Sequence, residues 1–312
     1  MSKSNNRVAV LGIFAADLTF RAARMPVPGE TLAGSGFASS LGGKGSNQAI
    51  AAARAGAAVT FISRIGQDGF GDTALAAWAA DGISARVVRS GTEPTGAAFI
   101  FVDQTSGENA IIVYAGAALS LSARDVEDAA DAIEDASVFI TQLEQPIAVA
   151  RRGLEIARAA GVTTIFNPAP YLPFEADLYG LCDYITPNET EAASMTGVAI
   201  GSPDDARAAG DRLLARGVGT ALITLGAKGA LLHTATTSVL IPAFAAGPVV
   251  ETTGAGDAFN AGFASGLARG LDPVAAARFG SATAGLSVTR AGAAPSMPTR
   301  AEIEALLAAS VG

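Results

Sequence analysis

The chain has 312 residues, enough for one large α/β domain or two smaller ones. Half of its residues are hydrophobic but only 6% are aromatic, so its core must consist mainly of aliphatic side chains. A net charge of −8 without clustered lysine or arginine argues against a nucleic-acid partner. The single cysteine, Cys182, excludes an internal disulfide and a multi-cysteine metal site.

The sequence shows no export or membrane segment. Its first apolar run, Val8–Ile13, is too short for the core of a signal peptide. No apolar run reaches the roughly 18 residues that a membrane span needs. We therefore expect a soluble cytoplasmic protein without a membrane partner.

Short β-branched segments alternate along the chain with alanine-rich segments of helical period, which predicts βαβ units around a mostly parallel sheet. The predicted strands are Val8–Ile13, Val59–Ser63, Val138–Thr141, Thr163–Asn167, Tyr184–Thr186 and Ala221–Leu225. The predicted helices are Asn47–Ala55, Thr73–Ala80, Arg124–Ile133, Ala148–Ala160, Glu189–Met195, Asp204–Ala215, Ala258–Ala268 and Pro273–Val288. The expected fold class is α/β.

Two early segments interrupt this alternation. One is Glu30–Ser40, and the other contains the strand patterns Ala97–Asp103 and Asn109–Tyr114, joined by a short polar turn. They predict a small β-sheet built from about residues 30–40 and 95–115. We expect it to form a lid over the carboxyl ends of the main strands, within a single domain of residues 1–312.

The strongest chemical motif is the glycine-rich turn Thr252–Gly262, which precedes a predicted helix. Gly254, Ala255 and Gly256 allow the backbone to approach a ligand, and the N–H groups at a helix start can bind a phosphoryl group. Asp257 in the first turn can accept the proton of an alcohol. The positive end of the helix dipole is expected to keep this carboxylate ionised. The alternative is an ordinary acidic helix cap.

A second glycine-rich segment, Leu41–Ala49, opens another predicted helix. It is no Walker A loop, because a glycine follows Lys44 where a serine or threonine would bind Mg²⁺. Gly42 and Gly43 permit close approach, and Asn47 offers both a donor and an acceptor, which suits a neutral polyol. The alternative is a flexible turn with a helix cap.

A third motif, Thr186–Glu191, stands at the end of a predicted strand. Asn188 and Glu191 share one face of the following helix, and such oxygen ligands suit hydrated Mg²⁺. The alternative is an asparagine cap followed by an acidic first turn.

A fourth motif, Thr224–Gly229, combines a strand end with a glycine turn. Its backbone suits contacts with a nucleotide, and it suits an ordinary hairpin equally well.

In this order and spacing, the four motifs resemble the ribokinase branch of the PfkB sugar-kinase family over almost the whole chain. Further segments that carry the resemblance are Pro28–Glu30, Gln142–Glu144, Asn167–Pro170 and Val288–Gly292. The resemblance implies a three-layer α/β/α sandwich with a mostly parallel sheet of about nine strands. It also implies a β lid that often forms a homodimer interface, and transfer of the ATP γ-phosphoryl group to a sugar hydroxymethyl group.

The resemblance also assigns roles to residues. The sugar would be held by Asp17, Gly42, Gly43, Lys44, Asn47 and Glu144, with Asp257 as general base and Gly254, Ala255 and Gly256 as the anion hole. The nucleotide would contact Asn188, Thr224, Gly226, Gly229, Gly256 and Ser281. Glu191 would be linked to Mg²⁺, and a monovalent cation, K⁺, would be bound by Glu251, Thr253, Ser287, Arg290, Gly292 and Ser296.

Two positions depart from the family pattern. Ala15 stands where ribokinases usually have an asparagine that holds a ribose hydroxyl, and its loss could discriminate against ribose. Glu251 replaces an aspartate in the cation loop.

Three alternatives remain at this point. A nucleoside kinase of the same fold is less favoured because few aromatic residues accompany the lid. A non-catalytic sugar or nucleotide sensor would have little need of Asp257. A dinucleotide-dependent dehydrogenase would require the GxGxxG fingerprint, which the sequence lacks.

Overall fold

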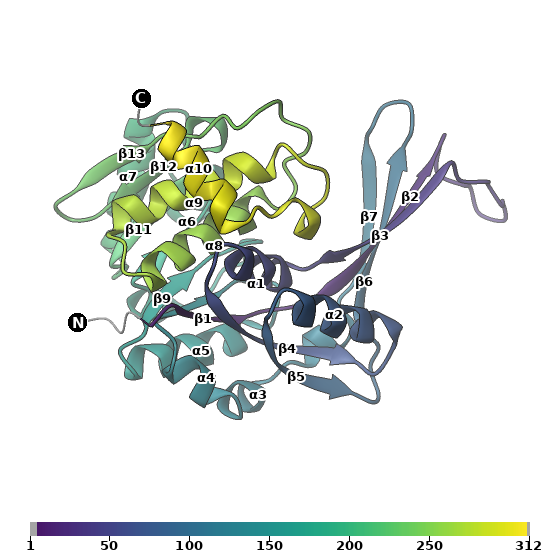
Figure 1. Cartoon of the computed structure of the whole chain (residues 1–312), viewed down its shortest axis with the longest axis horizontal. Helices are drawn as coiled ribbons and strands as arrows, with labels where there is room; N and C mark the ends of the chain where they lie inside the picture. Colours follow the sequence, from purple (N-terminus) through teal and green to yellow (C-terminus); the bar gives the residue numbers. More distant parts are fainter. Residues whose placement is uncertain (1–4, 311–312) are drawn as a thin grey trace.

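The computed structural model describes residues 5–310 and is centred on one large sheet. In the described residues this sheet has nine strands in the order β13-β12-β11-β10-β9-β8-β1-β4-β5 (Figure 1). Their bounds are β1 Arg7–Leu11, β4 Ala58–Gly66, β5 Ser84–Ser90, β8 Val138–Thr141, β9 Thr163–Phe166, β10 Tyr184–Ile185, β11 Thr220–Thr224, β12 Ala230–His233 and β13 Ser238–Ile241. The strands from β5 to β11 are parallel, and β12 and β13 are antiparallel.

Both faces of the sheet are covered because successive strand residues point to opposite sides. In β1, Val8 and Val10 enter one apolar cluster, whereas Ala9 and Leu11 enter another. The first cluster includes side chains of α1 Lys44–Arg54, α2 Gly69–Ala80, α8 Ala255–Ala268 and α9 Pro273–Ser287. The second includes side chains of α3 Ala123–Glu127, α4 Ala130–Glu134, α5 Ile147–Ala159, α6 Glu189–Thr196 and α7 Pro203–Leu214. The expected three-layer α/β/α sandwich is therefore confirmed.

A second, four-stranded sheet projects from this body (Figure 1). Its order is β3-β2-β6-β7, with bounds β2 Ala15–Ala22, β3 Gly36–Gly42, β6 Gly96–Asp103 and β7 Asn109–Tyr114. Two of its strands, β6 and β7, lie where the sequence predicts them. Within the other predicted segment of this sheet, residues 30–40, a strand begins only at Gly36, and residues 30–35 are not in a strand.

Other boundaries differ from the prediction. The predicted helix Arg124–Ile133 is divided into α3 and α4, so that Val126 and Ile133 both reach the second apolar cluster. The helices α1 and α8 each begin three residues earlier than predicted, at Lys44 and Ala255. The sequence did not predict β2, β5, β13 and α10 Arg300–Ala309.

Glycines bring the start of α1 against the end of β1. A β-carbon on Gly45 would lie 2.7 Å from the Cα atom of Gly12. Gly43 has a φ of +83°, and a β-carbon there would lie 2.7 Å from the carbonyl oxygen of Ile13. Because larger residues would force these segments apart, the glycines set the position of the first turn of α1.

Among residues 5–310, no helix is both long enough and apolar enough to span a bilayer.

Candidate active site

The candidate site lies at the carboxyl ends of the central parallel strands, where open α/β sheets bind ligands. Asn167 and Thr186 directly follow β9 and β10, and Thr224 ends β11. The starts of α1 and α8 reach the same edge, because Asn47 of α1 is hydrogen-bonded to Asp257 of α8. A cavity of about 230 Å³ opens there, lined by Lys44, Asn167, Ala169, Thr186, Asn188, Glu191, Thr224, Thr252, Gly254, Gly256, Asp257 and Asn260.

Asp257 is buried at the bottom of this site, with 5% of its surface exposed. Its Oδ2 accepts a hydrogen bond from Asn47 Nδ2 at 3.1 Å, and its Oδ1 accepts one from Gln48 Nε2 at 3.0 Å. The carboxylate is thus held by one amide donor on each oxygen.

Burial raises the pKa of Asp257, and this effect exceeds the lowering by Lys44 and by the amides of Gln48 and Asn47. The direction is opposite to the one expected from the helix start. The reason is that desolvation disfavours the charged carboxylate more than these neighbours stabilise it.

The start of α8 forms a polar edge of the cavity. The helix follows Gly254, whose φ of +78° is left-handed. Ala255 N–H donates to the carbonyl of Thr252 at 3.1 Å. The N–H groups of Gly256 and Asp257 belong to the first turn and have no acceptor within the helix, so they can meet an anion.

Lys44 is the central cation of the site. Burial lowers the pKa of the Lys44 ammonium group. The negative charges of Asp257, Glu144 and Glu191 together raise this pKa by more, so the net shift is upward. Its backbone N–H donates to Glu144 Oε2 at 2.7 Å. The raised pKa keeps the Lys44 side chain protonated. The backbone hydrogen bond joins the start of α1 to Glu144.

Two further carboxyl groups stand at the base of the small sheet. Burial raises the pKa of Glu144 to about 7, despite the opposing effects of Lys44. Burial likewise raises the pKa of Asp17 to about 6. A β-carbon on Gly42 would contact the Asp17 carboxylate, so only glycine leaves room for it.

Asn188 and Glu191 form a reciprocal helix cap. Glu191 N donates to Asn188 Oδ1, and Asn188 N donates to Glu191 Oε2, both at 2.8 Å. The capping alternative is thus confirmed for these two residues, although both also line the cavity. Burial raises the pKa of Glu191.

The other predicted nucleotide residues lie outside the cavity lining. Gly226 is exposed in the turn after β11. A β-carbon on Gly229 would collide with the carbonyl of Ile241, so the packing of β13 explains this glycine. Ser281 of α9 is buried and donates to the carbonyl of Pro242 at 2.7 Å.

The predicted cation-binding residues come from two adjoining segments. Glu251 Oε2 accepts from the N–H of Gly292 at 2.8 Å, which ties the segments together. Ser287 and Ser296 hydroxyls donate to the carbonyls three residues before them. Arg290 pairs with Glu302. Thr253 is exposed near the start of α8.

Several polar residues of the site were not assigned a role from the sequence. They are Gln48, Gln142, Asn167, Thr186, Thr252 and Asn260. For Gln142, Asn167 and Thr186 the signal was a polar side chain directly after a buried strand, and for Gln48 it was an amide that leads into the alanine-rich stretch of α1. Thr252 and Asn260 lie within the glycine-rich segment Thr252–Gly262 that the sequence had already singled out.

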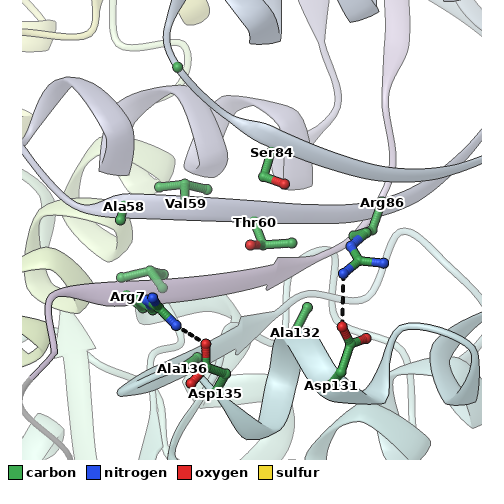
Figure 2. Close-up of a pocket in the computed structure, with 12 residues that line it drawn as sticks. Arg7, Ala58, Val59, Thr60, Ser84, Arg86, Asp131, Ala132, Asp135 and Ala136 are labelled. Atoms are coloured by element: carbon green, nitrogen blue, oxygen red, sulfur yellow. Dashed lines mark hydrogen bonds and ion pairs between the residues drawn. The ribbon is translucent and has the colours of Figure 1, made fainter.

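A cavity of about 290 Å³ opens at the opposite edge of the sheet (Figure 2). Its charged side chains pair with one another, Arg7 with Asp135 and Arg86 with Asp131. These pairs are exposed and satisfy each other, and the larger cavity offers no comparable set of convergent groups.

The raised pKa values predict a pH-dependent stability of the ligand-free protein. Glu144 has a pKa of about 7 against its usual 4.5, and Asp17 one of about 6 against 3.8. Between roughly pH 4.5 and 7 the folded state binds more protons than the unfolded state, so the free energy of unfolding falls as pH rises. Glu144→Gln should reduce this fall in urea unfolding experiments at about pH 5 and pH 7.5. An equal fall in Glu144→Gln and wild type would contradict the assignment; Glu108→Gln, in an exposed turn, is the control.

Comparison with known proteins identifies the family of this chain. The pattern of the "pfkB family carbohydrate kinase" matches residues 5–300. Ribokinase of Haemophilus influenzae is 40% identical over 95% of this chain and 96% of its own. Deoxyribokinase of Salmonella typhi is 35% identical over 94% and 95%. The structure of Arabidopsis thaliana ribokinase with ribose and ATP matches with a TM-score of 0.91, at 31% identity, over 96% of this chain and 98% of that one. The chain therefore belongs to the pfkB family of carbohydrate kinases, which transfer a phosphoryl group to a sugar hydroxyl.

Proposed function

We propose that this kinase transfers the γ-phosphoryl group of ATP to the hydroxymethyl group of ribose or a related small sugar, with Asp257 as general base. The observation that carries the proposal is the buried Asp257 carboxylate, held by two amides beside the open first turn of α8. The 40% identity to a ribokinase supports the sugar class.

The chemistry follows from this arrangement. The sugar hydroxyl oxygen attacks the γ-phosphorus, the bond from phosphorus to the bridging oxygen of ADP breaks, and the hydroxyl proton passes to Asp257. The first-turn N–H groups of α8 stabilise the charge that develops on the phosphoryl oxygens. The raised pKa of Asp257 makes it a stronger base than an exposed aspartate.

The sugar is held next to this carboxylate. Asn47 Oδ1 is buried and has no partner in the described part of the chain, so it can accept from a sugar hydroxyl. Asp17 and Glu144 lie beyond Lys44 and offer further acceptors. At the neighbouring Gly42 and Gly43, the lack of side chains would let the backbone approach the sugar closely.

ATP binds in this proposal along Asn188, Thr224 and the start of α8, which line one cavity. Gly226, Gly229 and Ser281 remain candidates for the outer part of the nucleotide site. Mg²⁺ would neutralise phosphate charge. Asn188 and Glu191 fit a water-mediated Mg²⁺, because both line the cavity while their capping bonds persist.

A monovalent cation, K⁺, fits between the two segments that the hydrogen bond from Gly292 N–H to Glu251 joins. The hydrogen bond between them brings backbone carbonyls of the 251–253 and 287–296 regions near the start of α8. Such a cation would order the anion hole by holding the segment before Gly254.

Replacing Asp257 tests the base. Asp257→Asn keeps the shape but cannot take the proton, so kcat for ribose phosphorylation should fall by at least about a hundredfold. The measurement is coupled ADP release under saturating ATP. Retention of kcat within about tenfold would mean that Asp257 is not the base, and circular dichroism checks that the variant is folded.

A substrate panel tests the sugar class. We expect ADP release with ribose or 2-deoxyribose to exceed that with hexoses and nucleosides in kcat/KM by about tenfold or more. Replacing Na⁺ by K⁺ should raise the rate. A preference for adenosine would instead identify a nucleoside kinase, and sugar binding without ADP release would identify a sensor.

We further propose that the small sheet covers the sugar as a lid and joins two subunits. Strand register places Phe20, Phe37 and Ile112 on the face opposite to that of Asp17, and they are 41%, 63% and 66% exposed. An exposed apolar face of this kind marks an interaction surface. A second copy of this sheet offers a matching face.

Charge on this face should separate the subunits. Ile112→Asp should shift the molecular mass in light scattering from about that of two chains to about that of one. Leu172→Asp, at an exposed apolar residue in a loop outside the small sheet, is the matched control. A wild-type protein that is monomeric at micromolar concentration would contradict the proposal.

A further inference from the structure

We propose that Gln142 and Gln48 form a positioning relay that fixes the orientation of the Asp257 carboxylate. In this relay Gln142 sets the direction of the Gln48 amide, and Gln48 holds one oxygen of Asp257. The inference rests on the proposed role of Asp257 as general base. Neither glutamine lines the cavity, so both act through Asp257 and not by touching the sugar.

Gln48 is completely buried in α1, one residue after Asn47. Its Nε2 donates to Asp257 Oδ1 at 3.0 Å and to Asn167 Oδ1 at 3.1 Å. Both N–H bonds of this amide are therefore used, and each ends on an oxygen of the site.

Gln142 decides which end of the Gln48 amide meets Asp257. Its Nε2 donates to Gln48 Oε1 at 2.5 Å, which leaves only the NH₂ group of Gln48 to face the carboxylate. Gln142 has no exposed surface, and a β-carbon on Gly12 would collide with its Oε1. Among the described residues the Oε1 of Gln142 has no hydrogen-bond partner, and the donor direction runs from Gln142 Nε2 through Gln48 to Asp257.

The consequence is a defined position for the proton-accepting atom. Gln48 occupies Oδ1 and Asn47 occupies Oδ2, so rotation of the carboxylate about its χ2 angle would break two hydrogen bonds. Such a fixed acceptor lowers the reorganisation needed during proton transfer. Hydrogen bonds to the ionised form also favour that form over the protonated one.

The charged groups around Asp257 are Lys44 and Glu144, with Asp17 and Glu191 beyond them. From the other elements, Asn167 after β9 and Gln142 after β8 contribute neutral amides. A change at Gln48 or Gln142 therefore alters the donors to Asp257 without removing any native charge.

The test is the pH profile of the single-turnover rate with ribose and ATP. Gln48→Met keeps the length but removes the donor, so the acid limb should move up by about one pH unit. Gln48→Glu places a negative charge there and should move the limb further. Gln142→Met removes the donor to Gln48 Oε1 without adding a charge and should move the limb in the same direction, although Gln142 does not touch Asp257. The KM for ribose should change less than about threefold in Gln48→Met and Gln142→Met.

Gln145→Met is the matched control. Gln145 is also buried, but its amide bonds to Thr141 Oγ1 and to the carbonyl of Gln142, so its loss should leave the acid limb in place. An unmoved limb in both Gln48→Met and Gln142→Met would overturn the relay. If Gln48→Met does not fold, Gln142→Met alone decides. Full activity of Asp257→Asn would instead refute the base itself.

Discussion

Desolvation of the Asp257 carboxylate is the constraint on which the site depends. A buried charge is costly unless polar groups surround it, and here they come from three elements: α1 supplies Lys44, Asn47 and Gln48, and the segments after β8 and β9 support them. Burial still raises its pKa. The same burial that makes ionisation harder also makes the carboxylate a better proton acceptor, which is what a general base near neutral pH requires.

The donors to this carboxylate lie on α1, and the start of α1 packs closely against the end of β1 because glycines without side chains meet there. Gly12, Gly43 and Gly45 allow contacts that a β-carbon would prevent. Within one turn of this contact, Asn47 and Gln48 face Asp257 across the gap between α1 and α8. The glycines thus set the position of α1, and the position of α1 sets the geometry of the amides around Asp257.

The sequence predicted the parallel core well because buried strands and amphipathic helices have distinct periods, and β8 was predicted to the residue. The sequence did not predict β2 and α10, where the local signal was present but short. Only Gly12–Phe14 separate β1 from β2, which obscures a second strand. The helix α10 begins with a capping box of Thr299 and Glu302, a signal that could have identified it. The role of Gln48 could not be predicted, because its partners lie about 94 and 209 residues away in the chain.

Two motifs of the same local appearance have opposite outcomes, and hydrogen-bond partners explain the difference. Each consists of an acidic residue in the first turn of a helix, which alone fits a cap. Glu191 does bond to the backbone of Asn188 at the start of its own helix. Asp257 instead directs both oxygens at side chains of α1, and Gly254 holds the cap position of α8. A carboxylate whose partners come from another element is positioned by the tertiary fold, and this distinguishes the candidate base from a helix cap.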